Sequence, residues 1–161
     1  MPDDDADRAY VAGLTLLARR ELAEAQLRAR LGKRQFDPDE VDAAVERLRR
    51  ERALDDRRTA LACARTEVRV RHRGRARVLR RIEALGIDRD VAREAVAEVF
   101  ADLDETDLLE QALDRRLRRG LALDDPLAIR RVHRYLVGQG FDPSAVTRLL
   151  RRRRSPAADS L

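Results

Sequence analysis

Apolar residues recur along this chain in a pattern that repeats three times. The pattern is an apolar residue, a second one four positions later, a third nine positions after the first, an aspartate, and a final apolar residue. The three copies are offset by 51 and then 54 positions: Leu27, Leu31, Phe36, Asp37 and Val45; Val78, Ile82, Ile87, Asp88 and Val96; Val132, Leu136, Phe141, Asp142 and Leu150. A period of about fifty residues is typical of proteins built from repeated helical modules.

The repeated positions predict two helices joined by a turn in each copy. Apolar residues four positions apart share one face of a helix, and the third lies just past the helix end, where a turn can bury it. In the third copy a glycine, an apolar residue, an aspartate and a proline follow one another at 140–143. These residue types indicate a helix end followed by a capped helix start. We interpret Asp37, Asp88 and Asp142 as N-caps worth about 1 kcal/mol each, not as catalytic groups.

A further helical stretch precedes each pair, at Tyr10–Arg20, Arg58–His72 and Asp107–Arg119. The repeated unit therefore has three helices, and about nine helices with short connections account for the chain. No segment shows the alternation of β-branched residues expected of a strand. The sequence predicts an all-α fold, an elongated array of three tandem three-helix repeats in which each repeat completes its core against its neighbour.

The expected boundaries follow from this repeat. Residues 1–8 form an acidic N-terminal tail, and residues 154–161 form a flexible C-terminal tail. The three repeats occupy residues 9–53, 54–103 and 104–153.

Composition favours several small cores over one large core. Charged residues make up 40% of the chain, aromatic residues 3%, and tryptophan is absent, so the bulky side chains that fill a large core are scarce. The longest apolar run, at 11–18, is shorter than the ~20 residues that span a bilayer, and the acidic start differs from a secretory signal. A lone cysteine, Cys63, lies among apolar residues and indicates a small core position in a reducing compartment. We expect a cytoplasmic protein with no membrane partner.

Charge is distributed unevenly along the chain. Residues 65–81 carry eight arginines against the single Glu67, a local charge of +7. Residues 83–110 then hold ten acidic groups against two arginines, a local charge of −8, and residues 148–154 add five arginines. Helical neighbours cannot neutralise all the arginines at 69–77, because these alternate across an expected helix break. The basic segment is a candidate contact for nucleic-acid phosphate or an acidic protein surface, with a tolerated solvated face as the alternative.

The few aromatic residues limit how a nucleic acid could be bound. Stacking on single-stranded bases needs exposed aromatic side chains, and only Tyr135 is not assigned to a turn or a core. Recognition would rest on the backbone and not on the base sequence. The affinity would fall as salt rises, with a log–log slope of about −0.7 for each phosphate neutralised on a single strand.

Candidate catalytic and metal-binding groups are sparse. His72 and His133 have no second histidine or cysteine at metal-ligand spacing, and no phosphate-binding glycine loop is present. The acidic pairs at 55–56 and 124–125 lie just ahead of expected helices, where capping and the helix dipole explain them. We therefore expect no catalytic residue, no metal and no cofactor.

Several segments resemble the RecX family of regulatory proteins, and the likeness covers about residues 9–152. The segments are Leu17–Leu27, Phe36 with Asp37, Val45–Leu48, Ala53–Arg57, Arg73–Arg75, Ile82–Asp88 and Tyr135–Asp142. Two positions depart from the family pattern. Gln35 stands where the first turn usually has a glycine, and Thr59 where an aromatic residue commonly follows the link at 54–57. Both departures concern packing within a module.

The resemblance implies tandem three-helix repeats and binding to the RecA recombinase, along the groove of its filament on single-stranded DNA. It also implies inhibition of RecA's ATP hydrolysis, strand exchange and co-protease activity, and hence a role in recombination, DNA repair and the SOS response. No catalytic group is needed for these effects. Filament capping, internal blocking and disassembly all stay open.

The basic face is the expected contact with RecA and DNA. In the middle repeat the candidates are Arg69, Arg71, Arg73, Arg75, Arg77, Arg80 and Arg81. Weaker candidates lie towards the two ends, at Arg19, Arg20, Arg151 and Arg152. One alternative is a helical-repeat protein that binds nucleic acid independently of RecA. The other is an enzyme that uses Asp55, Asp56 and His72, which metal-dependent turnover would reveal.

Overall fold

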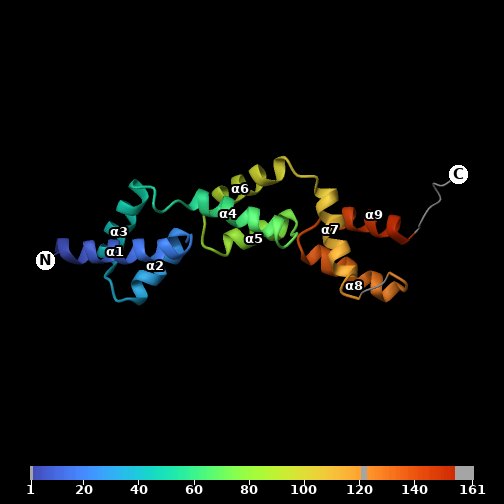
Figure 1. The fold of residues 1–161 in the computed structure, drawn as a ribbon, viewed down its shortest axis with the longest axis horizontal. Coiled ribbons are helices and arrows are strands. Elements are labelled where there is room, and N and C mark those ends of the chain that lie inside the picture. The colour runs from blue at the N-terminus through green and yellow to red at the C-terminus, as the bar shows by residue number, and fades with distance from the viewer. Residues whose placement is uncertain (1, 121–122, 155–161) are drawn as a thin grey trace. The chain divides into compact units, whose positions relative to one another are not determined.

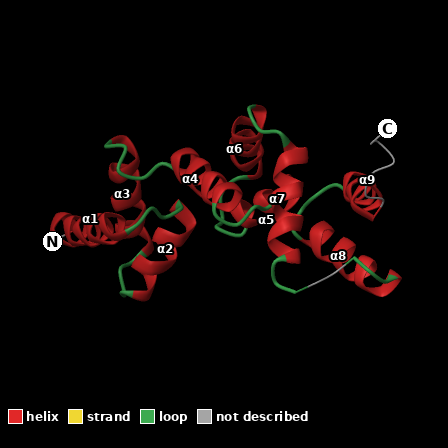
Figure 2. Cartoon of the chain, turned by 45° about the vertical axis from the view of Figure 1, so that its right-hand side comes forward, coloured by secondary structure: helices red, strands yellow, loops and turns green. Residues whose placement is uncertain are grey.

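The computed structural model describes residues 2–120 and 123–154, and within these residues the chain forms nine α-helices and no strand (Figures 1 and 2). The predicted all-α fold is confirmed. The helices are α1 (Pro2–Arg19), α2 (Glu24–Lys33), α3 (Pro38–Arg50), α4 (Asp56–Arg69), α5 (Arg75–Glu83), α6 (Arg89–Ala101), α7 (Glu105–Leu117), α8 (Pro126–Gly138) and α9 (Pro143–Arg154).

The helix bounds agree with the expected triplets apart from the N-terminal segment. Helix α1 begins at Pro2 and not near Tyr10, so residues 2–8 belong to a helix that continues into the first repeat. The sequence signal was weak there because acidic residues lack apolar periodicity. At the other end α9 extends to Arg154, and the rest of the expected C-terminal tail lies outside the described residues.

The repeated apolar skeleton is buried in all three copies. The first two positions of each copy are fully covered, and Phe36 alone among the repeated apolar positions is only half-buried. Cys63 is also half-buried, which is less than the sequence predicted for a core position. The fully covered positions are Leu27, Leu31, Val78, Ile82, Val132 and Leu136.

The expected capping aspartates lie at helix N-termini. The Asp88 carboxylate accepts from the backbone N–H of Asp90 at 2.8 Å, and the Asp142 carboxylate accepts from Ala145 at 2.8 Å. At Asp37 the reciprocal half of a capping box is present, because the Glu40 carboxylate accepts from the Asp37 N–H at 2.7 Å. Each arrangement satisfies a backbone group that the helix leaves without a partner. The capping interpretation is confirmed at Asp88 and Asp142, whereas at Asp37 the hydrogen bond runs from its own N–H to Glu40.

The chain divides into two compact units, and the division passes through the middle helix triplet. One unit comprises the described residues up to Cys63 together with Arg81–Ala95. The other comprises Ala64–Arg80 together with the described residues from Val96 onward. Helices α4, α5 and α6 each contribute to both units. The division into three repeats and their elongated arrangement stay predictions.

In the first unit, α1 packs against α2 and α3, and α2 packs against α3. The core of this triplet consists of aliphatic side chains, with Tyr10 and Phe36 packed at its margin. The absence of large aromatic groups from its centre agrees with the small cores expected from composition. The buried members are Leu16, Leu22, Leu27, Leu31, Val41, Val45, Leu48 and Leu54.

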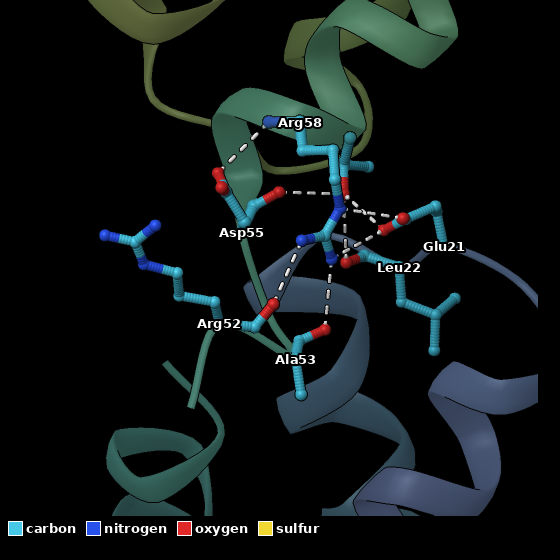
Figure 3. Close-up of polar contacts among 7 residues, drawn as sticks. Glu21, Leu22, Arg52, Ala53, Asp55 and Arg58 are labelled. Carbon is cyan, nitrogen blue, oxygen red and sulfur yellow. Dashed lines mark hydrogen bonds and ion pairs between the residues drawn. The ribbon is translucent and has the colours of Figure 1, made fainter. Parts of the chain in front are cut away.

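A polar cluster around Arg58 joins α4 to the first triplet (Figure 3). The Arg58 guanidinium donates to the Glu21 carboxylate at 2.8 Å and to the carbonyl oxygens of Arg52 and Ala53 at 3.0 and 3.2 Å. Its backbone N–H donates to Asp55, which precedes α4. Because arginine offers five donors in a planar fork, one side chain can satisfy several carbonyl groups of the loop between α3 and α4.

The second unit contains the last triplet, in which α7 packs against α8 and α9, and α8 packs against α9. Its buried side chains are again mostly leucine and valine, with Phe141 covered beneath the turn between α8 and α9. The C-terminal triplet thus reproduces the packing expected from the repeat, since its apolar stripe recurs at the spacing of one helical face.

Two turn glycines make a repeated close contact with the preceding triplet. A Cβ atom on Gly86, which follows α5, would lie 2.5 Å from the Cβ of Ala25 in α2. Gly140, which follows α8, accepts a hydrogen bond from the Ala76 N–H of α5 at 3.2 Å. Ala25 and Ala76 are 51 positions apart, and Gly86 and Gly140 are 54 apart. The contact therefore repeats with the same offsets as the apolar skeleton.

The same geometry explains why the first repeat tolerates Gln35. Gln35 is the position equivalent to Gly86, and it keeps the left-handed conformation of that turn with a φ of +67°. Its side chain is exposed in the structure, so the turn has room for atoms that the two glycine turns exclude. The left-handed backbone is common to all three turns, whereas the tight contact is seen at two.

We expect Gly140→Ala to destabilise the protein by more than Gly120→Ala. Both glycines have a positive φ, of +97° and +89°, so both substitutions incur a backbone penalty of about 1–2 kcal/mol. Only at Gly140 would the new Cβ lie 2.3 Å from a backbone nitrogen, that of Arg77, whereas nothing lies within 4 Å at Gly120. Urea denaturation of both variants measures the difference in unfolding free energy. Equal losses would contradict the tight contact.

Candidate functional site

A buried carboxylate organises the centre of the basic segment. Glu67, in α4, is 3% exposed and forms ion pairs with Arg73 and, at 3.6 Å, with Arg71. The backbone N–H of Arg73 also donates to the Glu67 carbonyl at 3.1 Å. Only 16% of the Arg73 side chain is exposed. Because a buried carboxylate is stable only when it is paired and hydrogen-bonded, Arg73 supports the fold of the loop after α4.

Two further arginines of the basic segment have partners within the chain. The Arg75 guanidinium lies 2.6 Å from a Glu105 oxygen and 4.9 Å from the centre of the Phe100 ring. Arg77 donates to the carbonyl oxygen of Gly138, the last residue of α8, at 2.9 Å. Both contacts lie within the second unit. The Arg75 ion pair is half exposed and contributes little to stability.

Three candidate arginines of the middle repeat are exposed and have no ion pair or side-chain hydrogen bond within residues 2–120 and 123–154. They are Arg69, in the last turn of α4, and Arg80 and Arg81, near the end of α5. Among the candidate arginines of the middle triplet they are therefore the guanidinium groups most available to an anionic partner.

The weaker candidates towards the chain ends also divide into two groups. Arg19, Arg20 and Arg151 are exposed and form no ion pair or side-chain hydrogen bond with other described residues. Arg152, in contrast, forms an ion pair with Glu110 of α7. The neighbouring Arg153 pairs with Asp114 at 2.6 Å, so the two bonds tie α9 to α7.

Several carboxylates of the acidic segment 83–110 form ion pairs or hydrogen bonds within the chain. Glu105 pairs with Arg75, and Glu110 pairs with Arg152. Glu83 lies 3.4 Å from Arg89. Asp88 and Asp104 accept hydrogen bonds at helix N-termini. These contacts account for half of the segment's ten acidic groups without an external partner.

The acidic pair at 55–56 has structural contacts. Asp55 accepts from the backbone N–H of Arg58 at 3.1 Å, and Asp56 accepts from the backbone N–H of Glu24 at 2.8 Å. Burial raises the pKa of Asp56 above its ordinary value, and the bond from Glu24 partly offsets this shift. Within the part of the chain that the structure describes, no group of three or more histidine, cysteine, aspartate or glutamate side chains could hold a metal ion.

Four residues from the last triplet approach the basic segment without having been predicted. Arg115, near the end of α7, and Arg119, in the turn after it, lie with Tyr135 and Gln139 around the loop that follows α4. Arg115 donates to the Val70 carbonyl oxygen at 2.7 Å. The sequence carries no signal for this proximity, because about 40 residues separate the partners and the charge pattern around 115–119 resembles an ordinary solvated helix face.

Comparison with known proteins identifies the family. A family model described as RecX, first three-helix domain, matches residues 9–48. The regulatory protein RecX of Syntrophotalea carbinolica is 30% identical over 134 residues, which cover 83% of this chain and 88% of that protein. The regulatory protein RecX of Treponema pallidum is 34% identical over 148 residues, covering 90% and 87%. The chain belongs to the RecX family.

Solved RecX structures share the fold. The crystal structure of RecX from Lactobacillus salivarius matches with a TM-score of 0.80 at 16% identity, over 93% of this chain and 97% of that one. A second crystal structure of regulatory protein RecX gives 0.77 at 20% identity, over 93% and 73%. The resemblance to RecX inferred from the sequence is confirmed, as is its helical-repeat fold. No described helix is long and apolar enough to cross a membrane.

We expect Arg73→Ala to lower the free energy of unfolding by about 3 kcal/mol, because it leaves the buried Glu67 carboxylate with only the longer contact to Arg71. The matched control is Arg69→Ala, which removes an exposed arginine and changes stability by less than about 0.5 kcal/mol. Chemical denaturation followed by circular dichroism measures both. If Arg73→Ala is as stable as the control, Glu67 is not held by this pair.

The substitution Asp56→Asn tests whether burial raises the pKa of the Asp56 carboxylate. The folded-state pKa of Asp56 is raised, so the native state binds a proton more readily than the unfolded state and this group's contribution to stability falls as pH rises. Asparagine keeps an oxygen acceptor for the Glu24 N–H but does not titrate. The stability of Asp56→Asn relative to the native protein should rise between about pH 3 and about pH 6. Denaturation of both proteins at several pH values measures this difference in stability. A fall in the relative stability of Asp56→Asn over this pH range would refute the raised pKa of Asp56.

Proposed function

We propose that this chain is a non-enzymatic regulator of RecA in the cytoplasm. It binds RecA and the RecA filament on single-stranded DNA, and it inhibits ATP hydrolysis, strand exchange and co-protease activity, thereby modulating recombination, DNA repair and the SOS response. The observation that carries this proposal is the match to regulatory RecX proteins along more than four fifths of the chain. Shared sequence over that length supports a shared partner.

The arginines without in-chain partners support an electrostatic mode of binding. Arg69, Arg80 and Arg81 are exposed, and their charge is not matched by a carboxylate in the described part of the chain. A filament of RecA on DNA presents phosphate groups and acidic side chains, which guanidinium groups bind through charge-assisted hydrogen bonds. Contacts of this kind hold the DNA backbone without reading its sequence. Arg19, Arg20 and Arg151 would extend the contact surface.

Arg71, Arg73, Arg75 and Arg77 contribute to the proposal in a different way. Each already contacts a group of this chain, namely Glu67, Glu105 or the Gly138 carbonyl oxygen. A partner that recruited Arg73 would have to replace its bond to a buried carboxylate, which is unfavourable. We therefore assign the support of the loop after α4 to Arg73, and direct contact with the partner to the exposed arginines.

The proposed inhibition is steric and electrostatic. A chain of helical modules bound across neighbouring RecA subunits would restrain the movement between them that accompanies ATP hydrolysis. Such a ligand shifts the filament towards the state that it binds more tightly, and the size of the shift equals its difference in affinity between the two states. No catalytic group in the inhibitor is required.

We expect substoichiometric amounts of this protein to inhibit the ATPase activity of RecA on single-stranded DNA. Neutralising the three exposed arginines together, as Arg69→Gln, Arg80→Gln and Arg81→Gln, should weaken the inhibition about tenfold or more. The matched control neutralises three exposed basic residues at the ends of α2 and α3, as Lys33→Gln, Arg34→Gln and Arg50→Gln. It removes the same charge at similar helix positions and should inhibit almost normally.

Two outcomes would refute the proposal. Undiminished RecA ATPase activity at equimolar protein would exclude RecA regulation. Equal affinity for bare single-stranded DNA and for RecA-coated DNA would favour a nucleic-acid-binding protein that acts independently of RecA.

A further inference from the structure

A small cavity in the second unit has four arginines in its wall. Its volume is about 220 Å³, and it lies between the loop after α4, the C-terminal part of α7 and the end of α8. The arginines are Arg71, Arg73, Arg115 and Arg119. Neutral polar groups complete the lining, among them the Tyr135 phenol and the Gln139 amide. Its lining contains no carboxylate.

The charge around this cavity is not balanced within the described residues. Among the described residues, Glu67 is the only carboxylate that pairs with any of the four arginines, and it contacts Arg71 and Arg73. Four guanidinium groups against one carboxylate leave a charge of +3. Like charges brought together in a partly enclosed space repel one another, and an anion that enters the space removes that repulsion. The cavity is therefore suited to an anionic ligand.

Hydrogen bonds orient Arg115, one of the four arginines in this cavity, before any ligand arrives. Arg115 donates from Nη1 to the Val70 carbonyl oxygen at 2.7 Å and lies 3.1 Å from His72 Nδ1. Since arginine has no acceptor, Nδ1 must accept this bond, which places the ring proton of a neutral His72 on Nε2. The Tyr135 ring is stacked on the Arg116 guanidinium at 4.6 Å. Prior orientation reduces the entropy that ligand binding must overcome.

The backbone at His72 is strained, and this strained conformation helps to form the cavity wall. His72 has a φ of +51°, a left-handed conformation that is unfavourable for a residue other than glycine. The conformation is held by the bond from its N–H to the Val68 carbonyl oxygen at 3.0 Å and by Arg115. It places Arg71, His72 and Arg73 in succession along the cavity wall. Strain of this kind collects at ligand-binding positions.

We propose that this cavity binds a phosphate group of a nucleic-acid strand. A phosphate offers several oxygen acceptors around one centre, so Arg71 of the loop after α4 can bind it together with Arg115 and Arg119. Arg73 stays paired with Glu67. A carboxylate offers two oxygens in one plane and matches fewer of these donors. The inference rests on the proposed function and deepens it, because it assigns one strand contact to Arg115 of α7 and to Arg119, two residues after that helix. Neither residue belongs to the basic segment 65–81.

The test measures binding of a 3′-labelled oligothymidylate by fluorescence anisotropy with RecA absent. We expect Arg115→Gln with Arg119→Gln to weaken binding about tenfold or more and to reduce the salt slope by about 0.7, the value for one phosphate. Arg119→Gln alone should weaken binding about threefold. This single variant removes no hydrogen bond or ion pair to another described residue, so it separates loss of the ligand from loss of the fold.

The matched control is Arg118→Gln with Arg131→Gln. Both arginines are exposed, belong to the same triplet and do not line the cavity, so this variant removes equal charge and should bind almost normally. If the cavity variants and the control have equal affinities and salt slopes, the inference is wrong.

Two oligonucleotides distinguish an internal phosphate from a terminal one. A strand with an ordinary backbone and a 5′-hydroxyl offers internal phosphodiesters only. A strand with an uncharged methylphosphonate backbone and a 5′-phosphate offers a terminal phosphate only. The cavity variants should weaken binding of at least one of them relative to the control. Failure to affect either overturns the inference.

The outcome for this cavity is separable from the outcome for RecA. The RecA ATPase assay uses the arginines at 69, 80 and 81, whereas the oligonucleotide assay contains no RecA. Normal ATPase inhibition with unchanged oligonucleotide binding by the cavity variants would overturn the cavity alone. Loss of oligonucleotide binding by those variants, with no RecA inhibition by the native chain, would support the cavity and refute RecA regulation.

Discussion

The burial of one carboxylate, Glu67, governs what the arginine-rich segment can do. Its 3% exposure requires a charged partner at short range, and Arg73 meets this need within six residues. That bond holds the loop after α4, which contains Arg71 and His72, and Arg115 of α7 contacts this loop at Val70 and His72. On a solvated helix face these arginines would be equivalent positive charges with no fixed orientation. Here they form a fixed arrangement of donors with excess positive charge.

A second constraint, the close approach at turn glycines, connects the helical triplets. Ala25 faces Gly86, and Ala76 bonds to Gly140, with the offsets of the sequence repeat. A small residue on a helix and a glycine in the facing turn let two backbones approach more closely than larger side chains permit. This contact uses no charge, so the polar positions of each triplet are left to vary. Variation of that kind allows one repeated scaffold to carry differently charged surfaces.

The proposed regulatory function combines these two features. A scaffold whose apolar positions recur can present arginines at intervals, and an anionic polymer offers phosphates at intervals. Exposed arginines without partners supply attraction over distance, which salt weakens. The cavity at the α4 loop would add a contact with defined geometry, because Arg73 is held by Glu67 and Arg115 by Val70 and His72. The exposed arginines would supply most of the binding affinity. The cavity would fix the position of the protein along the strand.

The sequence by itself determined the helices, their caps and the buried skeleton. These features depend on periodicity and on hydrogen bonds that span two to four residues, as at Asp88 and Asp142. The N-terminal extension of α1 was missed because its acidic residues carry no apolar period. Only the tertiary structure decided which arginines are available. Arg75 meets Glu105, Arg77 meets Gly138, and Arg115 meets His72 across 30, 61 and 43 positions. Charge is visible in a sequence, but pairing between distant segments depends on how packed helices bring them together.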